Sequence, residues 1–487
     1  MSMSSEPRLS LATLSTLPDS VRRPTYDRGA IRPGIVHIGI GNFHRAHQAE
    51  MTDRTLAAGA MDWGIIAASL RSPETRDALA PQDGLYTLCV RDGDGARYQV
   101  IGSIGAVIVA PENPAALIDA LALPSVRIVT LTVTEKGYCH LPATRSLDEA
   151  HADIVHDLAN PAAPRSAIGY LAAGLARRRS LGLAPFTVLC CDNLPANGET
   201  VKRVLTRFSA LLDPELGEHV ARDVAFPSTM VDRIVPATTD ADRALVLAAL
   251  GVKDAWPVMT EPFSQWVIED RFPQGRPAWE HAGAEFVADV APYELMKLRL
   301  LNGAHSMLAY IGSLVGHTYV ADAAADPAFV QLLKGFWEET ASTLPQNAGL
   351  DIPAYTRRLM ARYLNPEIRH RLAQIAMDGS QKLPQRQIAT IVDLRRRGEG
   401  FAHNALAVAG FLIYMTGTRS DGSAYEVRDP LASRFKAAGA ESAGDAKRLV
   451  LAALAIRDVF GRLEDDPIVI DALTNAVIRL RNSEISA

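Results

Sequence analysis

The sequence predicts an α/β fold in which a doubly wound first half is followed by a mostly α-helical second half. In the first half, short and nearly continuous apolar runs alternate with helical patterns, as buried parallel strands and their crossover helices do. From about Val287 onward the strand pattern fades and helical periodicity takes over. A chain of 487 residues also exceeds the usual size of one hydrophobic core. We therefore expect two domains, over residues 1–286 and 287–487.

The first half opens with a strand, a glycine turn and a helix. An apolar, β-branched run over residues 35–38 ends in Gly39-Ile40-Gly41, and a helical pattern follows from about His44 to Ala58. This is the beginning of a βαβ unit. Further apolar runs predict strands over 64–70, 127–133 and 186–191, and helices lie between them over 114–122 and 166–181.

The second half is predicted to be mostly helical. The division between the halves rests on the change of period near residues 285–292, because no Ser/Gly-rich or low-complexity linker marks it. Helical patterns cover residues 293–314, 327–343, 355–363 and 445–459.

Composition and charge exclude several classes of partner. The formal net charge of −5 indicates no broad basic surface, so nucleic acid is not an expected ligand. No long uncharged apolar run indicates a membrane span, and the first residues lack the pattern of a secretory signal. We expect a cytoplasmic protein that acts on a small molecule; its composition does not indicate an oligomeric state.

The chain contains four cysteines that show no paired metal-ligand spacing. We interpret them as reduced residues that pack in the interior, and the alternative is a catalytic or zinc-bound thiol. These residues are Cys89, Cys139, Cys190 and Cys191.

The glycine turn has the properties that a dinucleotide pyrophosphate requires. Gly39-Ile40-Gly41 lies between a predicted strand and a predicted helix, where a tight turn exposes backbone amides at the positive end of the helix. His44 occupies the place of the third glycine of the usual fingerprint. Taken alone, the motif therefore also fits a purely structural turn.

The position that usually reads the ribose leaves the choice of cofactor open. Arg71 follows the second predicted strand where a carboxylate is normal in NAD-binding proteins, and it could favour a 2′-phosphate. Glu74 could reach the ribose hydroxyls instead. NAD and NADP are both compatible with this segment.

Selected polar groups interrupt an apolar helical pattern over residues 293–306. At about 100° per residue, Glu294, Lys297, Asn302 and His305 fall within an arc of roughly 140°. Hydride transfer at a secondary alcohol needs a base for the hydroxyl proton and donors that hold the oxygen. Lys297 could be that base if burial lowers its pKa, and Glu294 could relay the proton to water. The alternative is a solvated polar stripe on an amphipathic helix.

Asn193 follows the last strongly predicted strand of the first half. Ligands of doubly wound sheets bind at this carboxyl edge, so Asn193 could polarise a carbonyl. Its alternative role is to cap the next helix or to form an Asx turn.

At these residues the sequence resembles the mannitol dehydrogenase family, the polyol-specific long-chain dehydrogenases, and the likeness covers nearly the whole chain. The family's own turn also lacks the third glycine, so His44 fits the resemblance. The matching segments are residues 38–48, 134–138, 191–193 and 230–236, together with the Lys-x₄-Asn-x₂-His pattern that begins at Lys297.

The resemblance implies a Rossmann-like first domain, a helical second domain and metal-independent hydride transfer with NAD at an active site between them. It implies that Lys297 is the general acid/base, that Asn193 and Asn302 polarise the reacting oxygen and that His305 positions the substrate. Asp232 would border the nicotinamide and the substrate. The cofactor-binding residues that it implies are Gly39, Ile40, Gly41, Asn42, Phe43, Thr134, Lys136 and Asp232.

Within this family the sequence is most similar to the fructuronate reductases, through residues 134–138, 261–270 and 374–386. The last segment contains Lys382 and Arg386, and an arginine is the expected partner of a hexuronate carboxylate. Both side chains could instead form surface or interdomain ion pairs. The alternatives are oxidation of mannitol or arabinitol and, more remotely, a dinucleotide-binding protein without catalysis.

Overall fold

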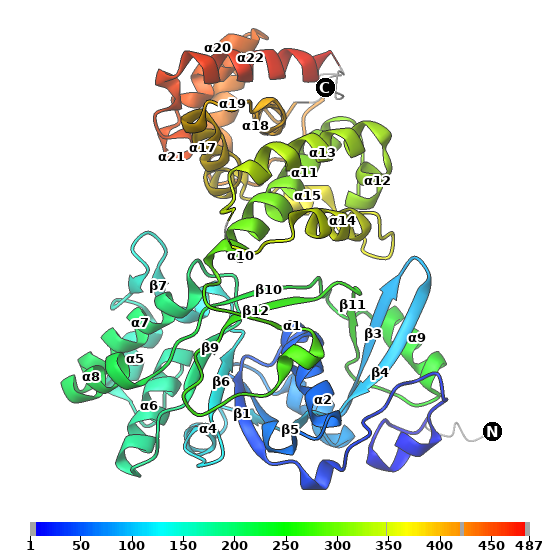
Figure 1. Cartoon of the computed structure of the whole chain (residues 1–487), viewed down its shortest axis with the longest axis vertical. Coiled ribbons are helices and arrows are strands. Elements are labelled where there is room, and N and C mark those ends of the chain that lie inside the picture. Colours follow the sequence, from blue (N-terminus) through cyan, green and yellow to red (C-terminus); the bar gives the residue numbers. More distant parts are fainter. Residues whose placement is uncertain (1–5, 347, 419–422, 483–487) are drawn as a thin grey trace. The chain divides into compact units, whose positions relative to one another are not determined.

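A computed structural model describes residues 6–346, 348–418 and 423–482 of the chain. The chain divides into two compact units, Met1–Val290 and Ala291–Ala487, and each is described by itself (Figure 1).

A five-stranded parallel sheet forms the centre of the first unit and confirms the predicted fold class. Its strand order, β5-β2-β1-β6-β9, places the first strand in the middle, as in a doubly wound sheet. The strands are β1 (Pro33–Ile38), β2 (Gly64–Ser69), β5 (Ile104–Val109), β6 (Ile128–Leu131) and β9 (Thr187–Cys190).

Helices cover both faces of this sheet. Successive side chains of each strand point to opposite faces, so each strand contributes to the packing on both. Val36 and Ile38 of β1 pack in one hydrophobic cluster with Leu171 of α6 (Ala167–Ser180). Ile35 packs in a second cluster with Met51 of α2 (Gln48–Ala57). Each face of the sheet therefore has its own core.

The helix predicted over residues 44–58 is in fact two helices, α1 (Asn42–Ala46) and α2, separated at His47. The backbone of His47 leaves the helical region, with φ −127° and ψ −86°. Its Nε2 donates to the Gln265 carbonyl at 2.9 Å, while Nδ1 accepts from the Gln48 amide at 3.0 Å. The break at His47 thus coincides with a tertiary hydrogen bond to Gln265. Helical periodicity along the chain does not predict such a break.

The sequence did not predict the smaller sheets of the first unit. One contains β3 (Tyr86–Asp92), β4 (Gly95–Ile101) and β11 (Val258–Thr260). Another contains β10 (Thr229–Asp232), β12 (Gln265–Glu269) and β13 (Glu285–Val287), and a hairpin joins β7 (His140–Leu141) to β8 (Ser146–Leu147). The remaining helices are α3 (Glu74–Leu79), α4 (Pro114–Leu121), α5 (Ala152–Ala159), α7 (Asn197–Leu212), α8 (Pro214–Asp223) and α9 (Asp240–Leu250).

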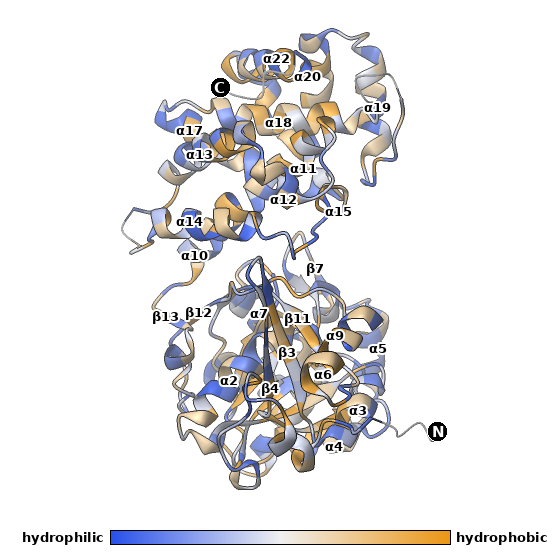
Figure 2. Ribbon diagram, turned by 90° about the vertical axis from the view of Figure 1, so that its right-hand side faces the viewer, coloured by the Kyte–Doolittle hydropathy of each residue, from blue (hydrophilic) through white to orange (hydrophobic). Residues whose placement is uncertain are grey.

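The second unit is helical, as predicted. Its central helix, α18 (Ala402–Met415), is buried along most of its length, and Figure 2 shows its apolar character. None of the helices in the described residues is both long and apolar enough to cross a bilayer. The others are α10 (Ala291–Met296), α11 (Gly303–Leu314), α12 (Val320–Ala325), α13 (Pro327–Ser342), α14 (Ile352–Tyr363), α15 (Leu372–Ile375), α16 (Gly379–Leu383), α17 (Ala389–Arg397), α19 (Ala432–Glu441), α20 (Ala446–Leu454), α21 (Arg457–Phe460) and α22 (Pro467–Arg481).

Candidate active site

The predicted site residues of the first unit follow the ends of neighbouring parallel strands. Gly39 follows β1, Arg71 follows β2, Thr134 follows β6 and Asn193 follows β9. Because β2, β1, β6 and β9 are adjacent in the sheet, these residues lie along one carboxyl edge. This is the edge at which doubly wound sheets bind ligands.

The two glycines of the turn have different physical roles. Gly39 has φ +97°, and a Cβ at this position would lie 2.2 Å from the Thr132 carbonyl oxygen. Gly41 is exposed, and a Cβ there would meet only the Gly39 oxygen, at 3.8 Å. Gly39 therefore closes the turn against the chain that follows β6, whereas Gly41 keeps open the space through which a pyrophosphate could approach.

His44, at the place of the third glycine, packs against β1 through another histidine. Its ring lies on that of His37 with centroids 3.3 Å apart and planes 8° from parallel. His37 itself bonds Thr130 at 2.8 Å and Thr132 at 2.9 Å, and burial lowers its pKa to about 3. Since the Thr132 hydroxyl donates to the Gly39 carbonyl, it accepts from Nε2 of a neutral His37. These hydrogen bonds connect His37 of β1 to the Gly39 carbonyl and so stabilise the glycine turn.

Asn42 uses its side chain within the protein. Its Oδ1 accepts from Arg45 at 2.6 Å and its Nδ2 donates to the Pro236 carbonyl at 3.3 Å. Arg45 is buried and also donates to the Trp256 carbonyl at 2.7 Å. Asn42 therefore fixes the turn to the loop after β10. Ile40 is buried, whereas the neighbouring Phe43 is partly exposed.

Arg71 and Glu74, the two residues expected near the ribose, differ in their side-chain contacts. Arg71 is exposed and forms no ion pair with any described acidic residue, whereas Glu74 accepts from the Ser72 hydroxyl at 2.9 Å. A pocket of about 380 Å³ is lined in part by Leu70, the residue directly before Arg71. Its other lining residues include Pro111, Pro114, His156, Arg165 and Tyr170.

The loop after β6 carries a strained residue. Thr134 has φ +66° and ψ 160°, a conformation that is essentially restricted to glycine and is severe for a β-branched side chain. Thr134 and Lys136 are both exposed on this loop. Strain of this kind persists only where the surroundings determine the backbone, and it occurs preferentially at functional sites.

Asp192, which the sequence analysis did not assign to the site, holds this loop. Its Oδ2 accepts from the Val133 amide at 2.8 Å and from the Tyr138 hydroxyl at 2.7 Å. Burial raises the pKa of Asp192, and these hydrogen bonds oppose the rise. Asp192 thereby joins the ends of β6 and β9 and fixes the residue that precedes Asn193. Two signals in the sequence pointed to it: its position directly before an expected site residue and its place in the family-like segment 191–193.

We expect Asp192→Asn to lower the free energy of unfolding by about 1–3 kcal/mol, because an amide has no charge and only one acceptor oxygen, whereas the buried carboxylate accepts from the Tyr138 hydroxyl and from the backbone amides of Val133 and Thr134. Denaturant unfolding followed by circular dichroism measures the effect. Asp94→Asn, at an exposed turn between β3 and β4, is the control and should change stability little. Equal stability of the two variants would show that Asp192 does not hold the loop.

Asp232 is the last residue of β10, where it is buried and pairs with Gln265 of β12. The start of β10 is tied to the main sheet, since the Thr229 hydroxyl donates to the Cys190 carbonyl at 2.6 Å. The sheet β10-β12-β13 therefore determines where Asp232 lies.

In the second unit, the segment predicted as one regular helix over residues 293–314 contains a π-helical turn. Glu294 belongs to α10, the π-helical segment covers Lys297–Asn302, and α11 begins at Gly303. The arc derived from an ideal α-helix therefore does not apply between Lys297 and Asn302. Such turns occur frequently at functional sites.

Side chains from elsewhere in the unit bond the carbonyls of this segment. Trp337 of α13 donates to the Leu300 carbonyl at 3.0 Å, and the Tyr363 hydroxyl donates to the Leu301 carbonyl at 3.0 Å. Arg386 donates to the Asn302 carbonyl at 3.1 Å, and Gln387 donates to that of Gly303 at 2.8 Å. The irregular backbone is thus stabilised by residues distant in sequence, which is why periodicity alone did not predict it.

Basic side chains act on His305, and two of them, Arg362 and Arg386, are arginines. Its ring lies 4.8 Å from that of Tyr363 and 5.7 Å from that of His370, measured between centroids. Part of its surface is accessible, yet burial, followed by the charges of His370, Arg362 and Arg386, holds the pKa of His305 well below its usual value. His305 is therefore a neutral hydrogen-bond donor near pH 7. The sequence contained no signal that Arg362 and His370 would lie beside it.

Lys382 and Arg386 form no ion pair in the described chain, although the charges of Asp378 and Asp429 act on Lys382 and oppose the fall of its pKa. Lys382 donates to the carbonyls of Ile375 and Met377, and Arg386 also donates to the Ser306 hydroxyl at 2.9 Å. Burial lowers the pKa of both groups, and in Lys382 the charge of Arg386 adds to the effect.

Comparison with known proteins gives matches over nearly the whole chain. The models of the mannitol dehydrogenase Rossmann domain and C-terminal domain match residues 33–281 and 289–481. An uncharacterized oxidoreductase of Escherichia coli, YeiQ, is 45% identical over 95% of each chain. The D-mannonate oxidoreductase of the same organism is 43% identical over 88% of this chain and 90% of its own. The structure of Pseudomonas fluorescens mannitol 2-dehydrogenase with NAD and D-mannitol covers 98% of both chains with a TM-score of 0.81 and 38% identity.

Proposed function

This chain belongs to the mannitol dehydrogenase family, and from that premise we propose that it is a fructuronate reductase, which interconverts D-fructuronate and D-mannonate with NAD. The family consists of oxidoreductases that act on polyols and sugar acids. The likeness to the D-mannonate oxidoreductase supports the choice of a sugar acid, and the likeness to the mannitol 2-dehydrogenase supports the alternative of a neutral polyol.

One observation carries the proposal: two buried cationic side chains of the second unit, Lys382 and Arg386, form no ion pair in the described chain, and the charge of Arg386 acts on His305. Lys382 donates to two carbonyls, Arg386 donates to a carbonyl and a hydroxyl, and the charge of Arg362 also acts on His305. Burial makes these charges costly unless an anion accompanies them. A hexuronate carboxylate is such an anion, and an arginine can bind it through two parallel hydrogen bonds.

In the proposed reaction, some side chains transfer the proton and others donate hydrogen bonds to the substrate. Lys297 accepts the hydroxyl proton when the alcohol is oxidised and returns it when the ketone is reduced, while Glu294 exchanges that proton with water. Asn193 and Asn302 donate to the reacting oxygen, and the neutral His305 donates to the substrate. NAD, when bound, accepts or supplies the hydride.

The first unit has the features that an NAD molecule needs. The open space above Gly41 fits a pyrophosphate, and the pocket beside Leu70 suits the adenosine end. We propose that Gly39–Phe43, Thr134, Lys136 and Asp232 line the cofactor site. The exposed Arg71 makes a 2′-phosphate tolerable, so activity with NADPH is also expected.

Initial rates with purified protein test the proposed function. D-fructuronate and D-fructose differ only in the carboxylate, so their reduction with NADH or NADPH isolates its contribution. We expect kcat/KM to be at least about a hundredfold higher for fructuronate, because a neutral ketose leaves the buried cations unpaired. A higher value for fructose, or faster oxidation of D-mannitol or D-arabinitol than of D-mannonate, would favour the polyol alternative.

A further inference from the structure

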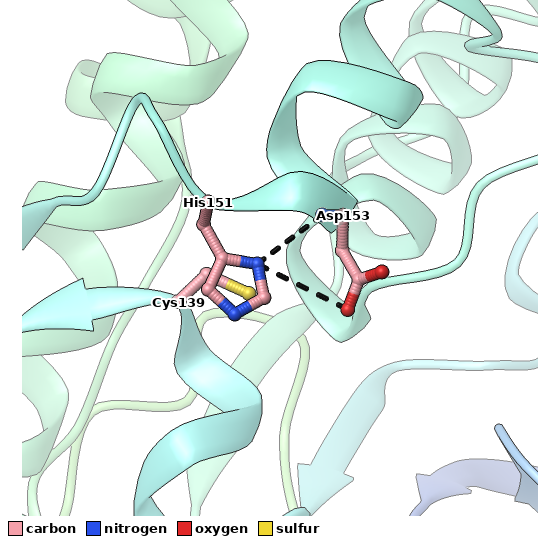
Figure 3. Close-up of side chains that lie close together, drawn as sticks. All are labelled: Cys139, His151 and Asp153. Carbon is pink, nitrogen blue, oxygen red and sulfur yellow. Dashed lines mark hydrogen bonds and ion pairs between the residues drawn. The ribbon is translucent and has the colours of Figure 1, made fainter.

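Three potential metal ligands meet in the first unit, apart from the residues assigned to hydride transfer. Their ligand atoms, one each from Cys139, His151 and Asp153, all lie within 4.8 Å of one another. Figure 3 shows the thiol beside the imidazole ring, with the Asp153 carboxylate turned toward it.

Local structure brings these residues together. Cys139 precedes β7, and the Asp148 amide donates to the Cys139 carbonyl at 2.9 Å, which closes the hairpin of β7 and β8. The chain then reaches His151, the N-cap of α5, and Asp153 in its first turn. The hairpin thus returns the chain past Cys139 just before α5 begins.

Helix capping explains part of this arrangement. His151 Nδ1 accepts from the Asp153 amide at 3.2 Å and lies 4.0 Å from its carboxylate. The thiol of Cys139 has no comparable role: its hydrogen bond to the Gly137 carbonyl is long, at 4.0 Å. Cys139 is nevertheless buried, with its sulfur next to the cap.

The surroundings of the thiol are negative. Burial, followed by the carboxylates of Asp153, Asp157 and Asp148, raises the pKa of Cys139 to about 12. In the part of the chain that the structure describes, no lysine or arginine forms an ion pair with Asp148 or Asp153. A divalent cation at the cluster would compensate this charge and would deprotonate the thiol.

The donor set selects the metal. Thiolate, imidazole and carboxylate are ligands of Zn²⁺, which binds sulfur at about 2.3 Å and nitrogen or oxygen at about 2.0–2.2 Å in a tetrahedron. The donor atoms of such a site are about 3–4 Å apart, so the cluster needs only a small contraction. Mg²⁺ and Ca²⁺ prefer sets of oxygen ligands, and this cluster offers them one carboxylate.

We propose that Cys139, His151 and Asp153 bind one Zn²⁺ ion, with water as the fourth ligand, and that the ion fastens the β7–β8 hairpin to the start of α5. Binding releases the thiol proton to solvent, and a ring nitrogen of His151 supplies its lone pair to the ion. No oxidation or reduction takes place. The site is structural, and hydride transfer does not pass through it.

Cobalt substitution tests the proposal on the untagged full-length protein after treatment with a chelator. Co²⁺ is the probe, because a cobalt–thiolate bond gives a near-ultraviolet charge-transfer band and tetrahedral Co²⁺ gives intense visible bands. We expect the bands to saturate at one ion per chain, Zn²⁺ to abolish them and Mg²⁺ to have no effect.

Variants identify the ligands. Cys139→Ser should abolish the charge-transfer band, whereas Cys89→Ser, which alters a buried cysteine in another core cluster, should retain it. Asp153→Asn keeps the thiol, so the band should persist with an affinity for Co²⁺ at least about tenfold lower. Absence of the band in the parent protein, or an equal band in Cys139→Ser, would overturn the proposal. Loss of hydride transfer on chelation would overturn its structural character.

Discussion

Lys297→Met is expected to lower kcat for ketone reduction by a factor of about 10²–10⁴, because the reacting oxygen loses its proton donor. Methionine preserves an unbranched stem in the π-helical segment, so the backbone that carries Asn302 should be retained. The affinity for NADH, measured by fluorescence titration, should change by less than about threefold, because the lysine acts on the substrate. A fall in kcat without a change in cofactor affinity indicates that the lost interaction is made mainly in the transition state.

The control for this variant is Lys334→Met, which removes an exposed lysine of α13. Its kcat should equal that of the parent protein. Small primary amines added to Lys297→Met should restore part of the rate, and the limb of the pH profile that reports the acid/base group should disappear. Parent-like turnover in Lys297→Met near neutral pH would refute the assigned role of Lys297.

Arg386→Gln is expected to lower kcat/KM for D-fructuronate by about 10–100-fold and that for D-fructose by less than about threefold. Glutamine removes the charge but retains a donor for the Asn302 carbonyl and the Ser306 hydroxyl, which Arg386 bonds now. The design separates recognition of a carboxylate from support of the π-helical segment. Arg396→Gln, which removes an exposed arginine of α17, is the control and should leave both values unchanged.

Equal losses on the two ketoses would mean that Arg386 only supports the segment around Asn302. The carboxylate would then need another partner, and Arg362 would be the next candidate because its charge also acts on His305. This result would leave the role of Lys297 untouched, since the two predictions concern different atoms of the substrate.

The sequence by itself determined the class of fold and the first elements of the site. Apolar runs that alternate with helical periods predicted the parallel sheet, because burial on both faces leaves a continuous local pattern. The sequence also predicted the glycine turn, because the backbone conformation at residue 39 requires a glycine. Helical periodicity correctly identified the second unit, although it did not reveal the π-helical turn at Lys297 or the break at His47.

Only the tertiary structure decided which distant residues meet. The small sheet that positions Asp232, the bond from Asp192 to the strained loop at Thr134, and the placement of Arg362 beside His305 all join segments separated by many residues. The physical reason is that a periodic pattern records which face of an element is buried, whereas the partner on that face is chosen by packing and by the need to bond irregular carbonyls. The cluster at Cys139 has the same origin, because a hairpin and a helix cap bring its donors together.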